Sequence, residues 1–409
     1  MDDQPVLETR FNGLTHAVPS LPASWYLDAD HHAREMREIW GHTWVYLCRA
    51  EELEGPRAFR RFDVAGQPIL LLRDGDGVLK GFFNTCRHRG SVLCPQAAGV
   101  LKKDLITCPY HQWAYDLTGR LRATGPMRPV DGFDRDDHPL LPVAVAEWGG
   151  FVFANLDAEA EPFKALYGAE TAYVANWPLE DLRIGHRFSK QLDCNWKIFW
   201  ENYNECLHCP NIHPELCELV PIYGRAIMAR RDDPEWEAHA NDDAPHLSGG
   251  LRTGAETWSM DGAAQGRLPG LSDDDVASGQ RYVTVMPSVF IAHHADYVRT
   301  VRITPLAPDR MEISSEWLFH PEMMAQPGFD MTRITDFATL VMEQDGAACE
   351  LNQAGLGARA FTQGVLMQEE YEVFLFHEWI RRQLGEPTLS DGAAPSRASR
   401  RRVMPQSDQ

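Results

Sequence analysis

The sequence contains no segment that could anchor the chain in a membrane or direct it to secretion. Among its 409 residues no apolar run approaches the ~18 residues that a membrane-spanning helix needs. The first five residues, Met1 to Pro5, lack the basic and apolar stretches of a signal peptide. We therefore expect a cytoplasmic protein that has no membrane partner.

Basic residues are scarce. The chain has 39 Lys and Arg against 59 Asp and Glu, which gives a formal net charge of -20 at pH 7. Nucleic acids and anionic membrane surfaces are negatively charged and would repel such a protein. Composition therefore argues against nucleic acid as a partner.

Paired cysteines are not expected either. The chain has nine cysteines, an odd count. Four of them crowd into residues 194–217. This distribution suits free thiols and metal chemistry better than a disulfide framework.

The clearest positive signal is a pair of short strings, Cys86-Arg-His88 and Cys108-Pro-Tyr-His111. A 2Fe-2S cluster that has thiolates on one iron and imidazoles on the other needs two loops, each with one sulfur and one nitrogen ligand. The alternative is a structural Cys2His2 zinc site, in which both cysteines share one loop and both histidines share a helix. Because each string here is mixed, the cluster is favoured.

The surrounding residues carry a resemblance. Asn84-Thr-Cys-Arg-His-Arg-Gly90 and Cys108-Pro-Tyr-His-Gln-Trp113 resemble the cluster loops of Rieske proteins, specifically those of Rieske non-haem iron oxygenases. The resemblance implies a 2Fe-2S cluster held by the side chains of Cys86, His88, Cys108 and His111.

The pattern around these loops is that of a small β domain. Short runs rich in Val, Ile, Leu and Phe, separated by turn sequences, fill residues 44–156; examples are residues 67–73 and 150–155. We expect antiparallel strands there, with both cluster loops at strand ends. A helix over residues 28–41 precedes them, inside an N-terminal lead-in of residues 1–43.

Helical patterns return in residues 157–386, and we expect a second domain there. A hairpin is predicted within residues 281–319, where two period-two runs are joined at residues 305–308. Residues 232–280 predict a long loop over the active site, and residues 387–409 are expected to be disordered. Helices are expected at residues 162–177, 195–209, 330–356 and 368–384. The predicted fold class is α+β.

A second candidate metal site lies in the predicted helix of residues 195–209. Glu201, Glu205 and His208 are spaced i, i+4 and i+7, which places them on one helix face. His213 follows just past Pro210, where a helix must bend or stop. Two histidines and a carboxylate from elsewhere would form a facial triad that leaves positions open on Fe(II) for O2 and substrate.

Two competing readings of this region are weaker. Cys206, Cys209, His213 and Cys217 have the residue types of a zinc knuckle, but the gaps are wrong and the neighbours are acidic instead of basic. These cysteines are interpreted as small packing residues. The pair His293-His294 is interpreted as non-ligating, because adjacent strand residues point to opposite faces.

The second site resembles the catalytic domain of the same oxygenases, a twisted antiparallel sheet flanked by helices. The resemblance implies that His208 and His213 bind the mononuclear Fe(II), and that Glu205 relays electrons from the cluster of another subunit in a homotrimer. It implies an acidic third ligand on a late helix, for which Asp345 is the choice. The other acids in this stretch, expected on a solvated face, are Glu343, Glu350 and Asp336.

These inferences converge on an O2-dependent oxidoreductase. Nothing in the chain resembles a nucleotide-binding glycine loop, so a separate NAD(P)H-dependent flavin and iron-sulfur reductase is expected to supply electrons. Glu205 and the string Asn-x-Glu-Cys-x-His-Cys are similar to the oxygenases that attack glycine betaine, carnitine and stachydrine, which favours hydroxylation or N-demethylation of a small quaternary ammonium or N-methylated substrate. Aromatic-ring hydroxylation is the alternative. A bare Rieske electron-transfer protein would leave the second motif unexplained.

Overall fold

The computed structural model describes residue 14 and residues 16–228, 250–277 and 279–389. The chain divides into two compact units. The smaller consists of Met36–Gly168 with Val285–Ser288, and the larger of Met1–Glu35, Ala169–Thr284 and Val289–Gln409. Helices and antiparallel sheets are both present, so the predicted α+β class is confirmed.

Antiparallel sheets make up the smaller unit. Their strand orders are β5-β4-β3-β6, β10-β11-β2 and β7-β8-β9. The strands are β2 (Val45–Arg49), β3 (Ala58–Val64), β4 (Gln67–Arg73), β5 (Leu79–Phe83), β6 (Ala98–Val100), β7 (Leu105–Thr107), β8 (Trp113–Asp116), β9 (Leu121–Thr124), β10 (Ala144–Trp148) and β11 (Phe151–Asn155).

The β3-β4 hairpin shows how local sequence sets this sheet. Val64 pairs with Gln67, so only Ala65 and Gly66 form the turn. Both have positive φ, 53° and 74°. A two-residue turn with positive φ at both positions matches the twist of antiparallel strands. The turn thereby fixes which residues of β4 face the core, including the fully buried Leu70.

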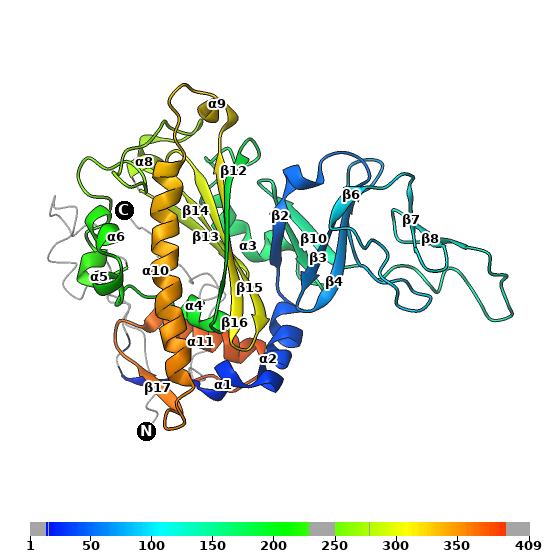
Figure 1. Ribbon diagram of the computed structural model, residues 1–409, viewed down its shortest axis with the longest axis horizontal. Coiled ribbons are helices and arrows are strands. Elements are labelled where there is room, and N and C mark those ends of the chain that lie inside the picture. The colour runs from blue at the N-terminus through cyan, green and yellow to red at the C-terminus, as the bar shows by residue number, and fades with distance from the viewer. Residues whose placement is uncertain (1–13, 15, 229–249, 278, 390–409) are drawn as a thin grey trace. The chain divides into compact units, whose positions relative to one another are not determined.

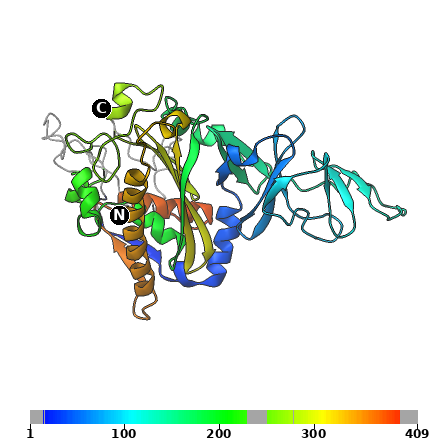
Figure 2. The ribbon, with the colours of Figure 1, turned by 45° about the horizontal axis from the view of Figure 1, so that its top comes forward.

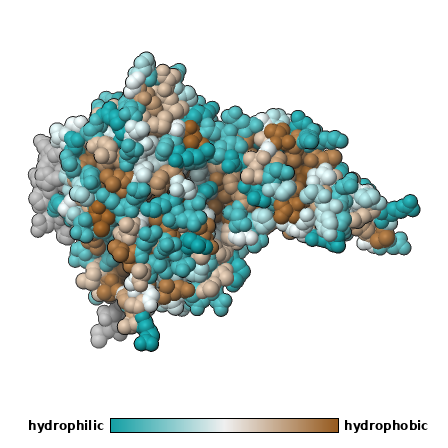
Figure 3. Space-filling view, in the orientation of Figure 1, coloured by the Kyte–Doolittle hydropathy of each residue, from teal (hydrophilic) through white to brown (hydrophobic). Residues whose placement is uncertain are grey.

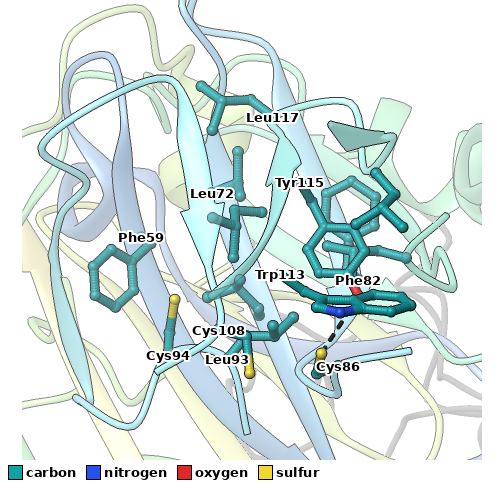
Figure 4. Packing of buried hydrophobic residues seen from close by; sticks show 14 residues of the cluster. Phe59, Leu72, Phe82, Cys86, Leu93, Cys94, Cys108, Trp113, Tyr115 and Leu117 are labelled. Carbon is teal, nitrogen blue, oxygen red and sulfur yellow. Dashed lines mark hydrogen bonds between the residues drawn. The ribbon is translucent and has the colours of Figure 1, made fainter. Parts of the chain in front are cut away.

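The core of the smaller unit reaches the two predicted cluster loops. Figure 4 shows Cys86 and Cys108 at one end of this core, close to Trp113 and Tyr115. Both sulfur-bearing residues are buried, at 3% and 1% exposure. The loops are therefore anchored by the packing of their own cysteines.

A five-stranded antiparallel sheet forms the centre of the larger unit (Figure 1), with strand order β12-β16-β15-β14-β13. The strands are β12 (Arg183–Leu192), β13 (Arg281–Val285), β14 (Val289–His293), β15 (Val298–Ala307) and β16 (Arg310–Phe319). The β15-β16 hairpin confirms the period-two prediction. Its turn is tighter than expected, because pairing continues past Pro305 to Ala307 and Arg310.

Helices cover this sheet. In Figures 1 and 2 the long helix α10 lies beside the sheet, where it contacts α4 and β12. The α-helices are α1 (Ser24–Leu27), α2 (Ala29–Glu35), α3 (Phe163–Ala172), α4 (Trp196–Tyr203), α5 (Cys209–Ile212), α6 (Pro214–Leu219), α8 (Asp273–Ala277), α9 (Pro321–Met324), α10 (Thr332–Leu356) and α11 (Tyr371–Gln383). A small two-stranded sheet pairs β1 (Val18–Pro22) with β17 (Gln363–Leu366).

Close packing sets the depth of α10. A Cβ atom added to Gly346 would lie 2.8 Å from Cδ2 of Leu192, at the end of β12. No larger residue fits at this point without displacing Leu192. The glycine therefore lets α10 approach the sheet closely, directly beside Asp345.

Two predicted helices differ from the structure. The helix expected over residues 28–41 is capped by the Asp28 carboxylate as predicted, but α2 ends at Glu35 and a π-helix follows over Met36–Trp40. The helix expected over residues 195–209 ends at Tyr203. The residues after Tyr203 leave the helix because the Glu205 side chain accepts hydrogen bonds from the backbone N–H groups of Leu207 and His208.

The long loop predicted at residues 232–280 lies partly outside the described residues. Its described part, from residue 250, consists mostly of turns plus the short helix α8. The predicted tail lies outside the described residues from residue 390 onward. On the face drawn in Figure 3, apolar residues are dispersed among hydrophilic ones, and none of the described helices is long and apolar enough to span a bilayer.

Candidate metal centres

The two cluster loops of the smaller unit share one backbone design. In the first, the N–H of Cys86 donates to the carbonyl of Ser91, and the N–H of Gly90 donates back to Cys86. In the second, Cys108 and Trp113, with the N–H of Gln112, repeat both bonds at the same spacing. The fifth residue of each loop has positive φ, 73° at Gly90 and 63° at Gln112. The structure thus presents two equivalent turns, as the sequence predicted.

The two sulfur atoms lie on the buried side of this site. The Cys86 Sγ is 3.4 Å from the Tyr115 hydroxyl, which also accepts the N–H of Arg87. Burial raises the pKa of Cys108, but the N–H groups of Tyr110 and His111 outweigh it and hold that pKa below its usual value. Backbone N–H groups that favour a thiolate are what a sulfur ligand of iron requires.

The two imidazoles lie on the outer side. The ring centroids of His88 and His111 are 4.9 Å apart. His88 stacks on Trp113, and His111 stacks on Tyr110 at 3.7 Å. Desolvation and the guanidinium of Arg89 lower the pKa of His111, which favours the neutral form that binds metal. Two thiols within and two imidazoles at the edge fit a 2Fe-2S cluster of the mixed kind.

The second candidate centre lies in the larger unit, just after α4. Glu205 and His208 occupy the turn between α4 and α5, so the predicted single helix face is wrong for them. Pro210 is near the start of α5 and does not end a helix, and His213 marks the junction of α5 and α6. A turn in place of a helix still brings the two histidines together, with ring centroids 5.1 Å apart.

Asp345 on α10 completes this cluster. Its Oδ1 lies 2.8 Å from Nε2 of His213 and 3.4 Å from Nε2 of His208. The three ligand atoms all lie within 4.8 Å of one another. Two imidazole nitrogens and one carboxylate oxygen, all directed at one point, form the donor set that suits a non-haem Fe(II) site with open positions.

Each histidine of this centre is oriented by a hydrogen bond at its Nδ1 atom. The Nδ1 of His208 lies 2.6 Å from Oε1 of Glu205, and the Nδ1 of His213 lies 2.7 Å from Oε1 of Gln344. Gln344 is in turn oriented by a donation from its amide to Glu215. Because both Nδ1 atoms are occupied, both Nε2 atoms are free to bind a metal.

Charge in the centre favours a cation. Burial lowers the pKa of His208, but hydrogen bonds with Asp345 and Glu205 outweigh it and raise that pKa to about 9. Burial likewise raises the pKa of Asp345, yet the two histidines hold it below the usual value. The carboxylates of Asp345 and Glu205 thus give the site the negative charge that a divalent ion would neutralise.

The structure separates Asp345 from the other acids considered. Glu343 and Asp336 are exposed, and Glu350 accepts the N–H of Asp193. Glu201, the first acid of the predicted helix face, accepts hydrogen bonds from Tyr26 and His377 and takes no part in the centre. Gln344 was not predicted from the sequence, where its only signal is its position beside Asp345.

Two further expectations concern the neighbouring cysteines and histidines. Cys206 and Cys209 form a disulfide, so the expectation of free thiols is wrong for this pair. Their three-residue separation in a tight turn brings the two sulfurs together, which also removes the zinc-knuckle alternative. His293 and His294 are both buried, and their non-ligating role stays a prediction.

The donor sets fit an iron-sulfur cluster in the smaller unit and a mononuclear metal centre in the larger one. Residues 43–134 match the Rieske [2Fe-2S] domain, and residues 179–386 match the ring hydroxylating alpha subunit catalytic domain. The chain belongs to this family of Rieske non-haem iron oxygenase alpha subunits, which are O2-dependent oxidoreductases that carry a 2Fe-2S cluster and mononuclear iron.

Individual relatives agree with this assignment. The chain is 32% identical to the glycine betaine monooxygenase oxygenase subunit of Chromohalobacter salexigens, over 92% of this chain and 88% of that protein. It is 33% identical to the carnitine monooxygenase oxygenase subunit of Escherichia coli K12, over 53% of this chain and 58% of that one. A solved quaternary ammonium Rieske monooxygenase has the same fold, with a TM-score of 0.68 at 21% identity, covering 90% of this chain and 96% of that one.

Proposed function

We propose that the chain hydroxylates or N-demethylates a small quaternary ammonium or N-methylated compound. Relatives that act on glycine betaine and carnitine support this choice. The observation that carries it is a group of aromatic rings around the end of α4, the helix that precedes the turn with Glu205 and His208. Tyr203, the last residue of α4, stacks on Phe290 at 4.1 Å, and Tyr282 lies 6.4 Å from Tyr203.

These rings are suited to a cation without N–H groups. A quaternary ammonium cannot donate hydrogen bonds, so it is held mainly by the faces of aromatic rings, for ~0.5 to 2 kcal/mol each. Tyr203 and Tyr282 are only partly buried, so their surfaces can be reached. Since the turn that carries His208 begins directly after α4, a cation on Tyr203 would present its methyl groups near the metal ligands.

The ligand assignment is part of the proposal. Cys86, His88, Cys108 and His111 would hold the 2Fe-2S cluster, and His208, His213 and Asp345 would hold Fe(II). When bound, the two metal groups supply electron storage and the activation of O2. Within the chain, Glu205 and Gln344 fix the two imidazoles by accepting their Nδ1–H groups, which keeps the ligand geometry constant during turnover.

Electron supply and assembly complete the proposal. A separate NAD(P)H-dependent flavin and iron-sulfur reductase would reduce the cluster in the cytoplasm. In a head-to-tail homotrimer the cluster of one subunit would serve the iron of the next, with Glu205 as the connecting carboxylate. Mixed oligomers that combine a Cys108→Ala chain with a His208→Ala chain should then regain part of the activity that each variant has lost. Mixed oligomers that form yet stay inactive would refute transfer between subunits.

The metal assignment has a direct test in composition. We expect about three irons and two acid-labile sulfides per chain, with the visible absorbance of a Rieske cluster. Cys108→Ala should remove the colour, whereas His213→Ala should keep it and lose about one iron. Stoichiometric zinc without labile sulfide would exclude this reading.

The substrate class is tested by turnover. The purified oxygenase, with reductase, NADH and O2, is offered quaternary ammonium compounds and aromatic acids, and formaldehyde release reports N-demethylation. Consumption of a quaternary ammonium compound is the expected result. Hydroxylation of ring-bearing acids, with quaternary ammonium compounds neither bound nor consumed, would establish aromatic-ring hydroxylation instead.

A further inference from the structure

Arg299 on β15 is a buried cation, and no carboxylate in the described ranges forms an ion pair with it. Its exposure is 5%, and among the described residues neither its Nε nor its Nη1 has a hydrogen-bond partner. The nearest acid along the chain, Asp296, already accepts from the Thr257 hydroxyl and the N–H of Gln265. Burying an unpaired charge is strongly unfavourable. A site that maintains such a charge is suited to an anionic group that arrives from outside.

His294 and Tyr297 are neighbours of Arg299 in the turn that follows β14. Arg299 pairs across the strands with Ala292, and the N–H of His294 donates to Tyr297 in the turn that joins β14 to β15. Since strand side chains alternate, Arg299, His294 and Tyr297 share one face. His294 is 1% exposed, and its ring forms a hydrogen bond with the backbone of Gly279. Burial and Arg299 hold the pKa of His294 well below its usual value, so the imidazole is neutral and does not add to the positive charge.

Another donor lies beside His294. Within the part of the chain that the structure describes, the indole Nε1 of Trp258 has no partner, and its ring lies 5.7 Å from that of His294 and 6.2 Å from Phe337 on α10. A guanidinium and an indole, both donors, thus lie near the same imidazole, that of His294. Such a set of donors matches a carboxylate, which accepts two parallel hydrogen bonds from a guanidinium.

The same sheet face carries Phe290, the ring on which Tyr203 of the proposed cation site stacks. Phe290 pairs with Val301, two residues along β15 from Arg299. Arg299 and Phe290 are therefore diagonal neighbours on one face, about 7 to 8 Å apart and within reach of long side chains. Rings that suit a trimethylammonium group and a guanidinium that suits a carboxylate lie side by side.

We propose that Arg299 binds the carboxylate of the substrate, so that the substrate is a zwitterion with a quaternary ammonium at one end and a carboxylate at the other. This inference rests on the proposed function and narrows it. A simple cation such as choline would be repelled by the buried guanidinium, whereas a betaine brings the opposing charge itself. Arg299 is thus the residue that selects betaines over amino alcohols.

The test compares two ligands that differ only in the carboxylate. Glycine betaine and its amide, N,N,N-trimethylglycinamide, are titrated calorimetrically into the iron-loaded enzyme without O2. Wild type should bind the betaine about 10- to 100-fold more tightly, as expected for charged hydrogen bonds. Arg299→Met should lose this preference and bind the amide unchanged. The control Arg302→Met, on the same strand but the opposite face, should keep the preference.

A stability measurement separates ligand binding from a structural role. If Arg299 serves the ligand, Arg299→Met removes an unpaired buried charge and the ligand-free enzyme should melt at the same or a higher temperature. A lower melting temperature with unchanged betaine preference would overturn the proposal. So would equal losses for betaine and amide, while the proposed function would still stand. If wild type binds neither compound but binds benzoate through Arg299, the proposed function itself fails and the betaine assignment falls with it.

Discussion

Replacing Glu205 by Gln tests the support of the mononuclear centre most directly. The carboxylate of Glu205 receives three N–H groups: the Nδ1–H of His208 at 2.6 Å, the backbone N–H of His208 at 3.3 Å and the backbone N–H of Leu207. A carboxamide keeps the size of the side chain but has only one acceptor oxygen. At least one of these donors loses its partner, and the remaining bonds lose their charge assistance.

The loss can be estimated from these contacts. A hydrogen bond to a charged group contributes about 1.5 to 3 kcal/mol. Since a factor of ten corresponds to about 1.4 kcal/mol, iron affinity should fall about 10- to 100-fold. The same range is typical when the residue that orients a metal-binding histidine is removed. Turnover should fall at least tenfold even with iron in excess, because Glu205 is also the proposed link to the cluster of the neighbouring subunit.

The assay separates the two effects. Iron affinity is measured by competition with a chelator, and turnover is measured with saturating iron and reductase. Glu218→Gln, an exposed acid in the adjacent α6, is the matched control and should change neither quantity. A Glu205→Gln enzyme with unchanged iron affinity and full turnover would show that Glu205 neither orients His208 nor carries electrons.

Three further changes have defined outcomes. Gln344→Met removes the acceptor of the His213 Nδ1–H and should weaken iron binding about 10- to 100-fold without altering the cluster spectrum, which metal analysis and absorbance would report together. Lys197→Met breaks a fully buried ion pair of 2.6 Å with Glu35 and should lower the free energy of unfolding by about 3 to 5 kcal/mol, measured by chemical denaturation. The double variant with Glu35→Gln should regain most of that stability. A Lys197→Met variant as stable as wild type would contradict this prediction. Burial raises the pKa of Asp296 from 3.8 to about 6, so the folded state binds the proton of this carboxyl group more tightly than the unfolded state does. The free energy of unfolding should therefore fall by about 3 kcal/mol as the pH rises from about 4 to 6. Asp296→Asn should remove this pH dependence from the unfolding curves.

Local patterns in the sequence predicted most of the candidate ligands of the two metal centres. The cysteines and histidines of the smaller unit lie within turns of a few residues, so their spacing alone constrains how they meet. The same holds for Glu205 and His208, which approach each other through a turn although the sequence predicted a helix. The period-two run of residues 310–319 likewise identified β16, because alternation has only one regular backbone solution.

Contacts between distant segments had to come from the tertiary structure. Asp345, Glu343 and Glu350 are chemically similar acids on one helix, and only the side of α10 that faces α5 decides which one meets the histidines. The role of Gln344 follows from the same rotation of the helix. The Cys206–Cys209 disulfide depends on where α4 stops, which helix propensity did not reveal.

Arg299 illustrates the difference between what the sequence shows and what only the tertiary structure shows. Its sequence context, a strand with arginines at residues 299 and 302, gives no reason to treat one differently from the other. Only the folded sheet shows that Arg299 is buried beside Ala292 and without a partner among the described residues, while Arg302 lies 4.0 Å from Glu312. The sequence by itself determined the metal chemistry, because ligand types and spacings are local. The tertiary structure decided which distant charges meet and which stay unpaired, because burial is a property of the whole fold.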